Sequence, residues 1–349
     1  MKARFLIAAL LLTAGGAPVA GQSTDTALYV VRLGVDTVAV ERWVRSPDSL
    51  HVVAVTRSPR TTVRRYVVHF DGAGSVTGFS TGAAGAEVTP TGGAVPIAGG
   101  TFAPYALAVW QGMRASTSAI TVAMMAGGAV RDVVVQQRAD NEYTLPNQFG
   151  APLSVYVDER GGITAIDAGG GSTVERVPPF DFEMLTREFA ERDRDGTGLG
   201  PLSPRDTARA TLGGGTVMID YSRPSARGRT VMGGLVPWDD VWRTGANDAT
   251  QLITDVALRI GDVRVPPGSY SLFTVPRRGA WDLIINRQTG MSGLQRDPAQ
   301  DVGRMPMQPA AEASHTEQFT IRVEGAGTDA RLRIMWGDAD VSVRIRADP

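Results

Sequence analysis

Arginines gather in one segment of the chain, and their spacing could create a site for an anionic group. Four of them lie between residues 223 and 243. A guanidinium group presents five N–H donors in a planar fork and keeps its charge, so several converging forks would suit a carboxylate, sulfate or phosphate. Two tryptophans in the same segment could add stacking faces for a sugar ring. The candidate ligand-binding residues are Arg223, Arg227, Arg229, Trp238, Trp242, Arg243 and Asn247. The sequence therefore predicts a binding module for a small anionic or carbohydrate ligand.

A second interpretation of the same segment is structural. Its arginines would form ion pairs with the acids nearby in sequence, and the tryptophans would be core residues. The acids in question are Asp220, Asp239, Asp240 and Asp248. The sequence leaves both interpretations open, because it gives neither geometry nor burial.

Catalysis has less support in the residue types than binding does. A hydrolase would use a histidine with Asp239 or Asp240 as acid or base, and it would need a carboxyl group of raised pKa in a cleft. The histidines are His51, His69 and His315, and none has the spacing of a metal-ligand pair. We therefore assign no catalytic residue, favour binding over catalysis, and predict no metal site. A third possibility is an assembly module that meets a protein partner through exposed sheet faces or edges.

Two absences in the composition exclude several classes of chemistry. The chain has no cysteine, and Lys2 is its sole lysine. Thiol nucleophiles, cysteine-ligated zinc, iron–sulfur clusters, Schiff bases and the lysine of phosphate-binding loops are thereby excluded. The formal net charge is −1, which gives no electrostatic case for nucleic acid or a membrane surface as partner. No cofactor is expected.

Short alternating strands dominate the first half of the chain. They are predicted at 28–31, 37–40, 51–56, 63–70, 120–125, 130–136, 153–157 and 163–166. Turns between strands so close in sequence favour an antiparallel meander or a curved sheet. One interior helix is predicted at 105–114, where Leu107, Trp110 and Met113 recur at intervals of three. Such a helix could plug its own sheet, or the sheet and helix could together enclose an apolar ligand.

The order of segments predicts an exported chain of two mainly β domains. Residues 1–21 have the layout of a signal peptide, with an apolar run at 5–14 that is about half of what a membrane-spanning helix needs. The mature protein would be periplasmic or extracellular, with no inserted segment. A β-rich domain is predicted at 22–178, then a helix and a Gly/Pro linker at 179–209. Seven or more strands at 210–349 predict a β-sandwich.

Ordered blocks in the last two fifths of the chain resemble a known domain family. They include YSRPSARGR at 221–229, GGLVPW at 233–238, WRTGAN at 242–247, VPPGSYSLFT at 265–274, WDLIIN at 281–286 and LRIMWG at 332–337. Over about residues 216–345 the sequence resembles the DUF2911 family, a domain of unknown function found in exported bacterial proteins. The resemblance implies an exported protein and carries no activity. The N-terminal domain shows no such resemblance.

Overall fold

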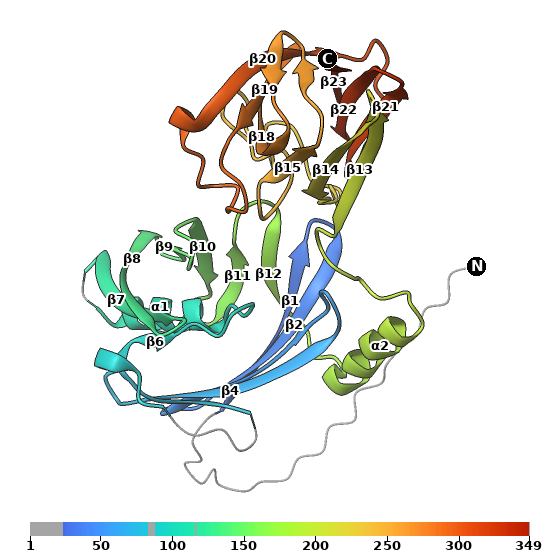
Figure 1. Cartoon of the computed structure of the whole chain (residues 1–349). Helices are drawn as coiled ribbons and strands as arrows, with labels where there is room; N and C mark the ends of the chain where they lie inside the picture. Colours follow the sequence, from blue (N-terminus) through green and yellow to red (C-terminus); the bar gives the residue numbers. More distant parts are fainter. Residues whose placement is uncertain (1–23, 83–87, 116, 349) are drawn as a thin grey trace, which may run out of the picture.

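Two curved β-sheets make up most of the molecule (Figure 1), so the mainly β fold that the sequence predicts is confirmed. The computed structural model describes residues 24–82, 88–115 and 117–348. The predicted signal peptide at 1–21 lies outside the described residues. Each sheet encloses its own apolar core, and each is nearly closed into a barrel.

The N-terminal sheet has twelve strands, in the order β5-β4-β3-β2-β1-β12-β11-β10-β9-β8-β7-β6. The strands are β1 (Asp25–Leu33), β2 (Asp36–Arg45), β3 (Ser49–Thr56), β4 (Thr62–Phe70), β5 (Val76–Thr81), β6 (Val95–Pro96), β7 (Ala119–Ala126), β8 (Ala129–Ala139), β9 (Glu142–Pro146), β10 (Pro152–Val157), β11 (Ile163–Asp167) and β12 (Ser172–Val177). Two antiparallel meanders, β1 to β5 and β7 to β12, meet where β1 pairs with β12, and the short β6 pairs in parallel with β7 at one edge. The predicted curved sheet is thus confirmed, and all eight predicted strands are present.

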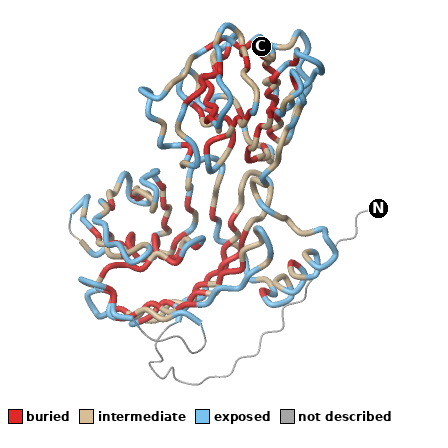
Figure 2. The backbone as a smooth tube through the Cα atoms, viewed as in Figure 1, coloured by how far each residue is buried: buried red, intermediate tan, exposed pale blue. Residues whose placement is uncertain are grey.

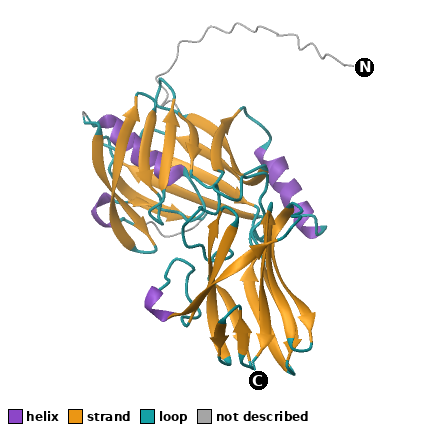
Figure 3. Cartoon of the chain, turned by 90° about the horizontal axis from the view of Figure 1, so that it is seen from above, coloured by secondary structure: helices purple, strands orange, loops and turns teal. Residues whose placement is uncertain are grey.

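Helix α1 (Ala103–Arg114) lies inside this curved sheet, as Figure 3 shows. It is buried on nearly every side, from Ala103 through Trp110, because its residues are almost all apolar or small. Gly112 approaches the side chain of Val135 on β8 so closely that a Cβ there would stand 3.1 Å from Cγ1. The predicted helix is confirmed, and it fills part of its own sheet.

Helix α2 (Phe182–Arg194) covers the opposite face of the same sheet. Asp181 caps it, since its carboxylate accepts a hydrogen bond from Met184 N at 2.7 Å. Phe182 and Phe189 on one face of the helix pack on Val40 and its neighbours. The helix therefore gives the convex side of β1, β2 and β3 a small core of its own.

The C-terminal sheet runs in the order β13-β14-β15-β18-β19-β20-β23-β16-β17, with β22 between β23 and β21. Its strands are β13 (Arg205–Leu212), β14 (Gly215–Ser222), β15 (Thr250–Thr254), β16 (Leu258–Ile260), β17 (Val263–Val265), β18 (Gly268–Arg277), β19 (Ala280–Asn286), β20 (Asp301–Pro309), β21 (Thr316–Ala326), β22 (Asp329–Gly337) and β23 (Ala339–Ala347). The predicted sandwich is not confirmed. Strand β20 pairs with both β19 and β23, which joins the two halves into one continuous sheet.

Strand β13 begins inside the segment that the sequence predicts as a linker. It is an edge strand with few large apolar side chains, and it pairs with β14 from Arg205↔Ser222 to Leu212↔Gly215. Only Leu212 of this strand is buried, so its sequence has too few large apolar residues for alternation to predict it. Buried positions are concentrated along the inner faces of both sheets, and the turns between strands are exposed (Figure 2).

Candidate functional site

Two of the predicted ligand-binding arginines lie at the contact between the domains. The side chain of Arg227 is 9% exposed and forms an ion pair with Asp36 of the N-terminal domain. Arg229 donates to three backbone carbonyls, and one of them, Gly170 O at 3.0 Å, also belongs to the N-terminal domain. The backbone adds a hydrogen bond from Val35 N to Arg227 O at 3.0 Å. These two side chains therefore connect the domains.

Arg223 is bound within the C-terminal domain. Its Nε donates to Phe319 O at 3.1 Å, its Nη1 to the carboxylate of Asp206 at 2.9 Å, and its Nη2 to the Thr320 hydroxyl at 3.0 Å. The fork thus ties the edge strand β13 to β21. All three of its nitrogens have partners inside the protein.

The two tryptophans of the segment occupy different places. Trp242 is 7% exposed and packs among Trp281, Phe319 and Trp336, with ring centroids 5.2 to 6.2 Å away. It is a core residue. Trp238 is half-buried at the edge of a hollow of about 370 Å³ in the C-terminal domain. The tryptophans therefore do not form one stacking site.

Arg243 and Asn247 lie beside the same loop. The aliphatic part of the Arg243 side chain passes directly over Gly293, where a Cβ would collide with it. Gly293 N donates to Asn247 O at 3.2 Å. Partial burial lowers the pKa of Arg243 from its usual value, although this residue stays charged. The seven predicted residues thus divide among the domain contact, the core, the link between β13 and β21, and two separate surface regions, and a ligand at them stays a prediction.

The acids that the sequence assigns to these arginines have other partners. Asp220 pairs with Arg205, Asp248 lies 3.9 Å from the same guanidinium, and Asp239 lies 3.7 Å from Arg277. The predicted pairings were wrong because strand register and domain contact, rather than distance along the chain, choose the partners. The ion pairs of the segment connect distant parts of the molecule.

The groups predicted for a hydrolase do not converge. The side chain of Asp239 is 74% exposed, and the carboxylate of Asp240 accepts a hydrogen bond from Val241 N. His51 and His69 are strand residues of β3 and β4, as predicted, and His315 forms an exposed pair with Asp338 at 2.9 Å. Among residues 24–82, 88–115 and 117–348, no group of three histidine or acidic side chains could hold a metal ion.

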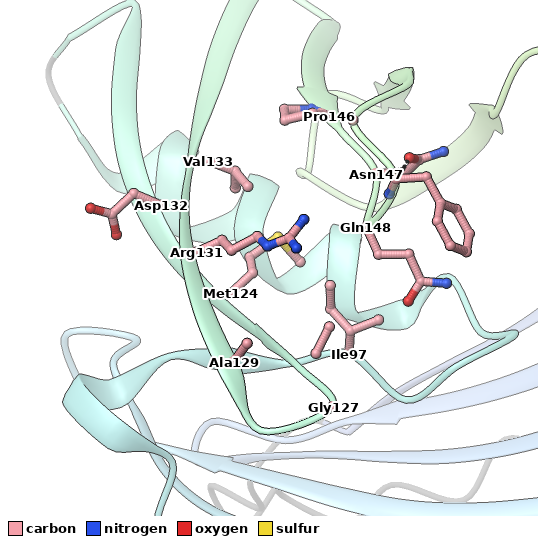
Figure 4. A pocket seen from close by; sticks show the side chains of 13 residues that line it. Ile97, Met124, Gly127, Ala129, Arg131, Asp132, Val133, Pro146, Asn147 and Gln148 are labelled. Atoms are coloured by element: carbon pink, nitrogen blue, oxygen red, sulfur yellow. Dashed lines mark hydrogen bonds between the residues drawn. The ribbon is translucent and has the colours of Figure 1, made fainter. Parts of the chain in front are cut away.

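A larger hollow lies in the N-terminal domain, on the concave face beside α1 (Figure 4). Its volume is about 510 Å³, within the range of small-molecule sites. Inward-facing residues of β7 and β8 form one wall, since Met124 stands opposite Arg131 in the strand register. Ile97, just after β6, lies below them, and the turn after β9 forms the other wall. The lining is mainly apolar.

The turn between β9 and β10 shapes the entrance of this hollow. Asn147 fixes the turn, because its side-chain oxygen accepts from Phe149 N at 2.8 Å and Ala151 N at 3.0 Å. Phe149 is 84% exposed at the tip. The same turn also borders a second hollow of about 220 Å³ near Tyr105 of α1. The Phe149 ring therefore lies at the border of both hollows.

Arg131 brings a positive charge into the apolar hollow. Its side chain points into the space beside Met124, whereas the neighbouring Asp132 points away from it, as Figure 4 shows. Within the described part of the chain, Arg131 has no ion pair at 4.0 Å or less. A free guanidinium group at the edge of an apolar site can bind the anionic end of a ligand.

A buried carboxyl group lies deeper under the same face. Glu41 is fully buried, and it accepts hydrogen bonds from Trp43 Nε1 at 2.7 Å and from Phe102 N at 3.0 Å, at the start of α1. Burial raises the pKa of Glu41 to about 7. Both oxygens have partners, so this group anchors α1 in the sheet and does not contact the hollow.

The sequence carries signals that mark these residues. Alternate residues of a strand share one face of the sheet. Arg131 is two residues from the inward-facing Val133 of β8, and Glu41 lies between the inward-facing Ala39 and Trp43 of β2. Phe149 is a large apolar side chain in a turn. A charged residue in the buried phase of a strand, or an aromatic one in a turn, marks a position of interest.

Comparison with known proteins identifies the C-terminal domain only by family. No curated protein matches the sequence. The solved structures that match include the crystal structure of MucB in complex with MucA(peri), at 10% identity, over 92% of this chain and 86% of that chain, with a TM-score of 0.15. A TM-score this low supports no inference. In the described residues, no helix is both long and apolar enough to cross a membrane. Residues 203–345 match the family model described as protein of unknown function (DUF2911), so the resemblance that the sequence predicts for the C-terminal part of the chain is confirmed.

Proposed function

We propose that this protein is a non-catalytic binding protein that holds an apolar molecule with an anionic end in its N-terminal domain. The observation that carries the proposal is the hollow of about 510 Å³, lined mainly by apolar side chains, into which Arg131 points. The apolar walls would bind the body of the ligand, and the guanidinium would bind its carboxylate, sulfate or phosphate. An exported location, predicted from residues 1–21, is part of the proposal.

The apolar part of the ligand supplies most of the affinity in this proposal. Each methylene group that leaves water contributes about 0.8 kcal/mol, which is about a fourfold gain in affinity. Alkyl carboxylates of increasing length should therefore bind about fourfold more tightly per methylene until the hollow is filled. Alkyl alcohols of equal length should bind more weakly, because they lack the charge that Arg131 recognises.

A fluorescent anionic probe tests the proposal, with displacement by the alkyl series as the measurement. Ala129 lines the hollow and Val130, the next residue of β8, faces the other side of the sheet. Ala129→Trp should fill the hollow and weaken binding at least tenfold. Val130→Trp adds similar bulk on the outer face and should bind like the unmodified protein. Thermal unfolding of both variants verifies that they fold.

Three results would contradict the proposal. The first is the same affinity for the two tryptophan variants, which would place the probe elsewhere. The second is an affinity that does not depend on alkyl length, since the walls would then contribute nothing. The third is a preference for carboxylates over alcohols that is the same in Arg131→Gln as in the unmodified protein. The charge of Arg131 would then have no role in recognition.

A further inference from the structure

The outer face of the C-terminal sheet carries a second concentration of arginine, across the strands β21, β22, β23, β16 and β17. Side chains alternate along these strands between the core and the surface. The inward positions are apolar and buried, whereas the outward positions hold seven arginines, which we call the arginine face. Its members are Arg259, Arg264, Arg322, Arg331, Arg333, Arg344 and Arg346.

The strand register places these arginines directly opposite one another. Every junction between neighbouring strands of the face has one such pair, and the pairs are Arg322↔Arg333, Arg331↔Arg344, Arg259↔Arg346 and Arg259↔Arg264. Like charges directly opposite in a sheet are destabilising. A surface that had only to remain solvated would be more stable with alternating signs. The same register places Glu324 opposite Arg331 and Asp329 opposite Arg346, so acids offset some of the arginines of the face and leave others beside like charge. An arrangement that keeps such an excess of positive charge points to a function that needs it.

Acidic side chains neutralise only part of the arginine face. Four acids pair with it: Glu324, Asp329, Asp340 and Asp348. Arg331 and Arg346 have no ion pair at 4.0 Å or less within the described residues. The face is therefore positive although the whole chain has a formal net charge of −1. The near-neutral total, which gave no case for a membrane-surface partner, conceals this separation of charge.

We infer that the arginine face binds the surface of a bilayer that contains anionic lipids. Neighbouring strands lie about 4.8 Å apart and alternate residues about 6.8 Å apart, so the charges form a two-dimensional array. Such an array fits many head-group phosphates at once, and arginine binds phosphate through two parallel hydrogen bonds. Protein partners ordinarily meet an apolar centre and single-stranded nucleic acid meets exposed aromatic rings. The outward positions of these strands hold neither.

Vesicle sedimentation with the full chain tests this inference. Vesicles of phosphatidylcholine with about a third phosphatidylglycerol should bind the protein, vesicles of phosphatidylcholine alone should not, and added salt should weaken binding. The triple variant Arg322→Gln, Arg331→Gln and Arg346→Gln changes one residue on each of β21, β22 and β23. At about 1 kcal/mol for each arginine, it should bind on the order of a hundredfold more weakly.

The matched control changes three exposed arginines of the N-terminal domain, Arg65→Gln, Arg138→Gln and Arg187→Gln. It alters the net charge equally and should retain vesicle binding. Equal losses in the two triple variants would overturn the inference, because total charge would then explain the binding. No binding to the anionic vesicles at low salt would also overturn it. So would tight binding to heparin or an oligonucleotide without binding to vesicles, since the face would then serve a soluble polyanion.

Discussion

The contact between the domains and the N-terminal hollow use arginine in opposite ways. At the contact between the domains, Arg227 Nη1 pairs with Asp36 and the Arg229 guanidinium donates to backbone carbonyls, so these donors are no longer open to a ligand. Arg227 Nε is buried without a hydrogen-bond partner among the described residues. In the N-terminal hollow, Arg131 points into an apolar space. Arg223, Arg227 and Arg229 thus make contacts that hold parts of the protein together, whereas Arg131, among apolar side chains, is the arginine of the proposed binding site. The number of charges in a segment says less about function than the surroundings of each charge.

The largest expected effect concerns the buried carboxyl group under the concave face. The folded pKa of Glu41, about 7, lies above its usual value of 4.5, so between these values the folded protein holds a proton that the unfolded chain has released. The free energy of unfolding should thus fall as pH rises from 4.5 to 7, by about 3 kcal/mol. Glu41→Gln has no carboxyl group to titrate, so its free energy of unfolding should not show this decrease of about 3 kcal/mol between pH 4.5 and 7. Urea unfolding at several pH values would measure the difference.

Glu175→Gln, at an exposed position of the same sheet, is the control and should keep the fall. A pH profile of Glu41→Gln that follows that of the unmodified protein would show that the carboxyl group is not buried as described. The packing of α1 in the curved sheet would then need revision.

A smaller effect is expected at the contact between the domains. Arg227→Ala leaves Asp36 without its partner, and the loss should be on the order of 2 kcal/mol, below that of a fully buried pair, because Asp36 regains water. A double-mutant cycle with Asp36→Ala would measure the coupling of the two side chains. Strictly additive losses would mean that the pair does not connect the domains.

The smallest effect is expected at Arg243. Its aliphatic carbons pack on Gly293, so Arg243→Ala should cost about 1 kcal/mol of stability through lost packing. Binding of an apolar anionic probe should not change, because the N-terminal hollow has no residue of this segment in its lining. Loss of probe binding in Arg243→Ala, with the fold intact, would move the site to the C-terminal domain and reverse the comparison.

Local sequence patterns predicted most helices and strands, but not how the strands join into two nearly closed sheets. Alternation predicted eight of the twelve strands of the N-terminal sheet, and the spacing of Leu107, Trp110 and Met113 predicted α1; the strands β5, β6, β9 and β12 lie outside the predicted ranges. The edge strand β13 was missed because little of it is apolar. The continuous C-terminal sheet was missed because the pairing of β20 with β23 joins residues far apart in the sequence.

The candidate binding site could not be predicted from local sequence patterns for a similar reason. The hollow combines Ile97, Met124, Arg131 and Phe149 from four separate segments, and no spacing relates them. The partners of the arginine segment, Asp36 among them, are distant in the same way. Residue types identified which chemistry was absent, whereas the position of a site depends on strand register and curvature.

Methyl resonances of methionine test the central claim most directly. Met124 lines the N-terminal hollow and Met232 lines the hollow beside Trp238 in the C-terminal domain. In a protein labelled at its methionine methyl groups, titration with an alkyl carboxylate should shift the signal of Met124 and leave that of Met232 unchanged, with Met→Leu variants to assign the two signals. Shifts of Met232 alone would place the ligand in the C-terminal domain and contradict the account.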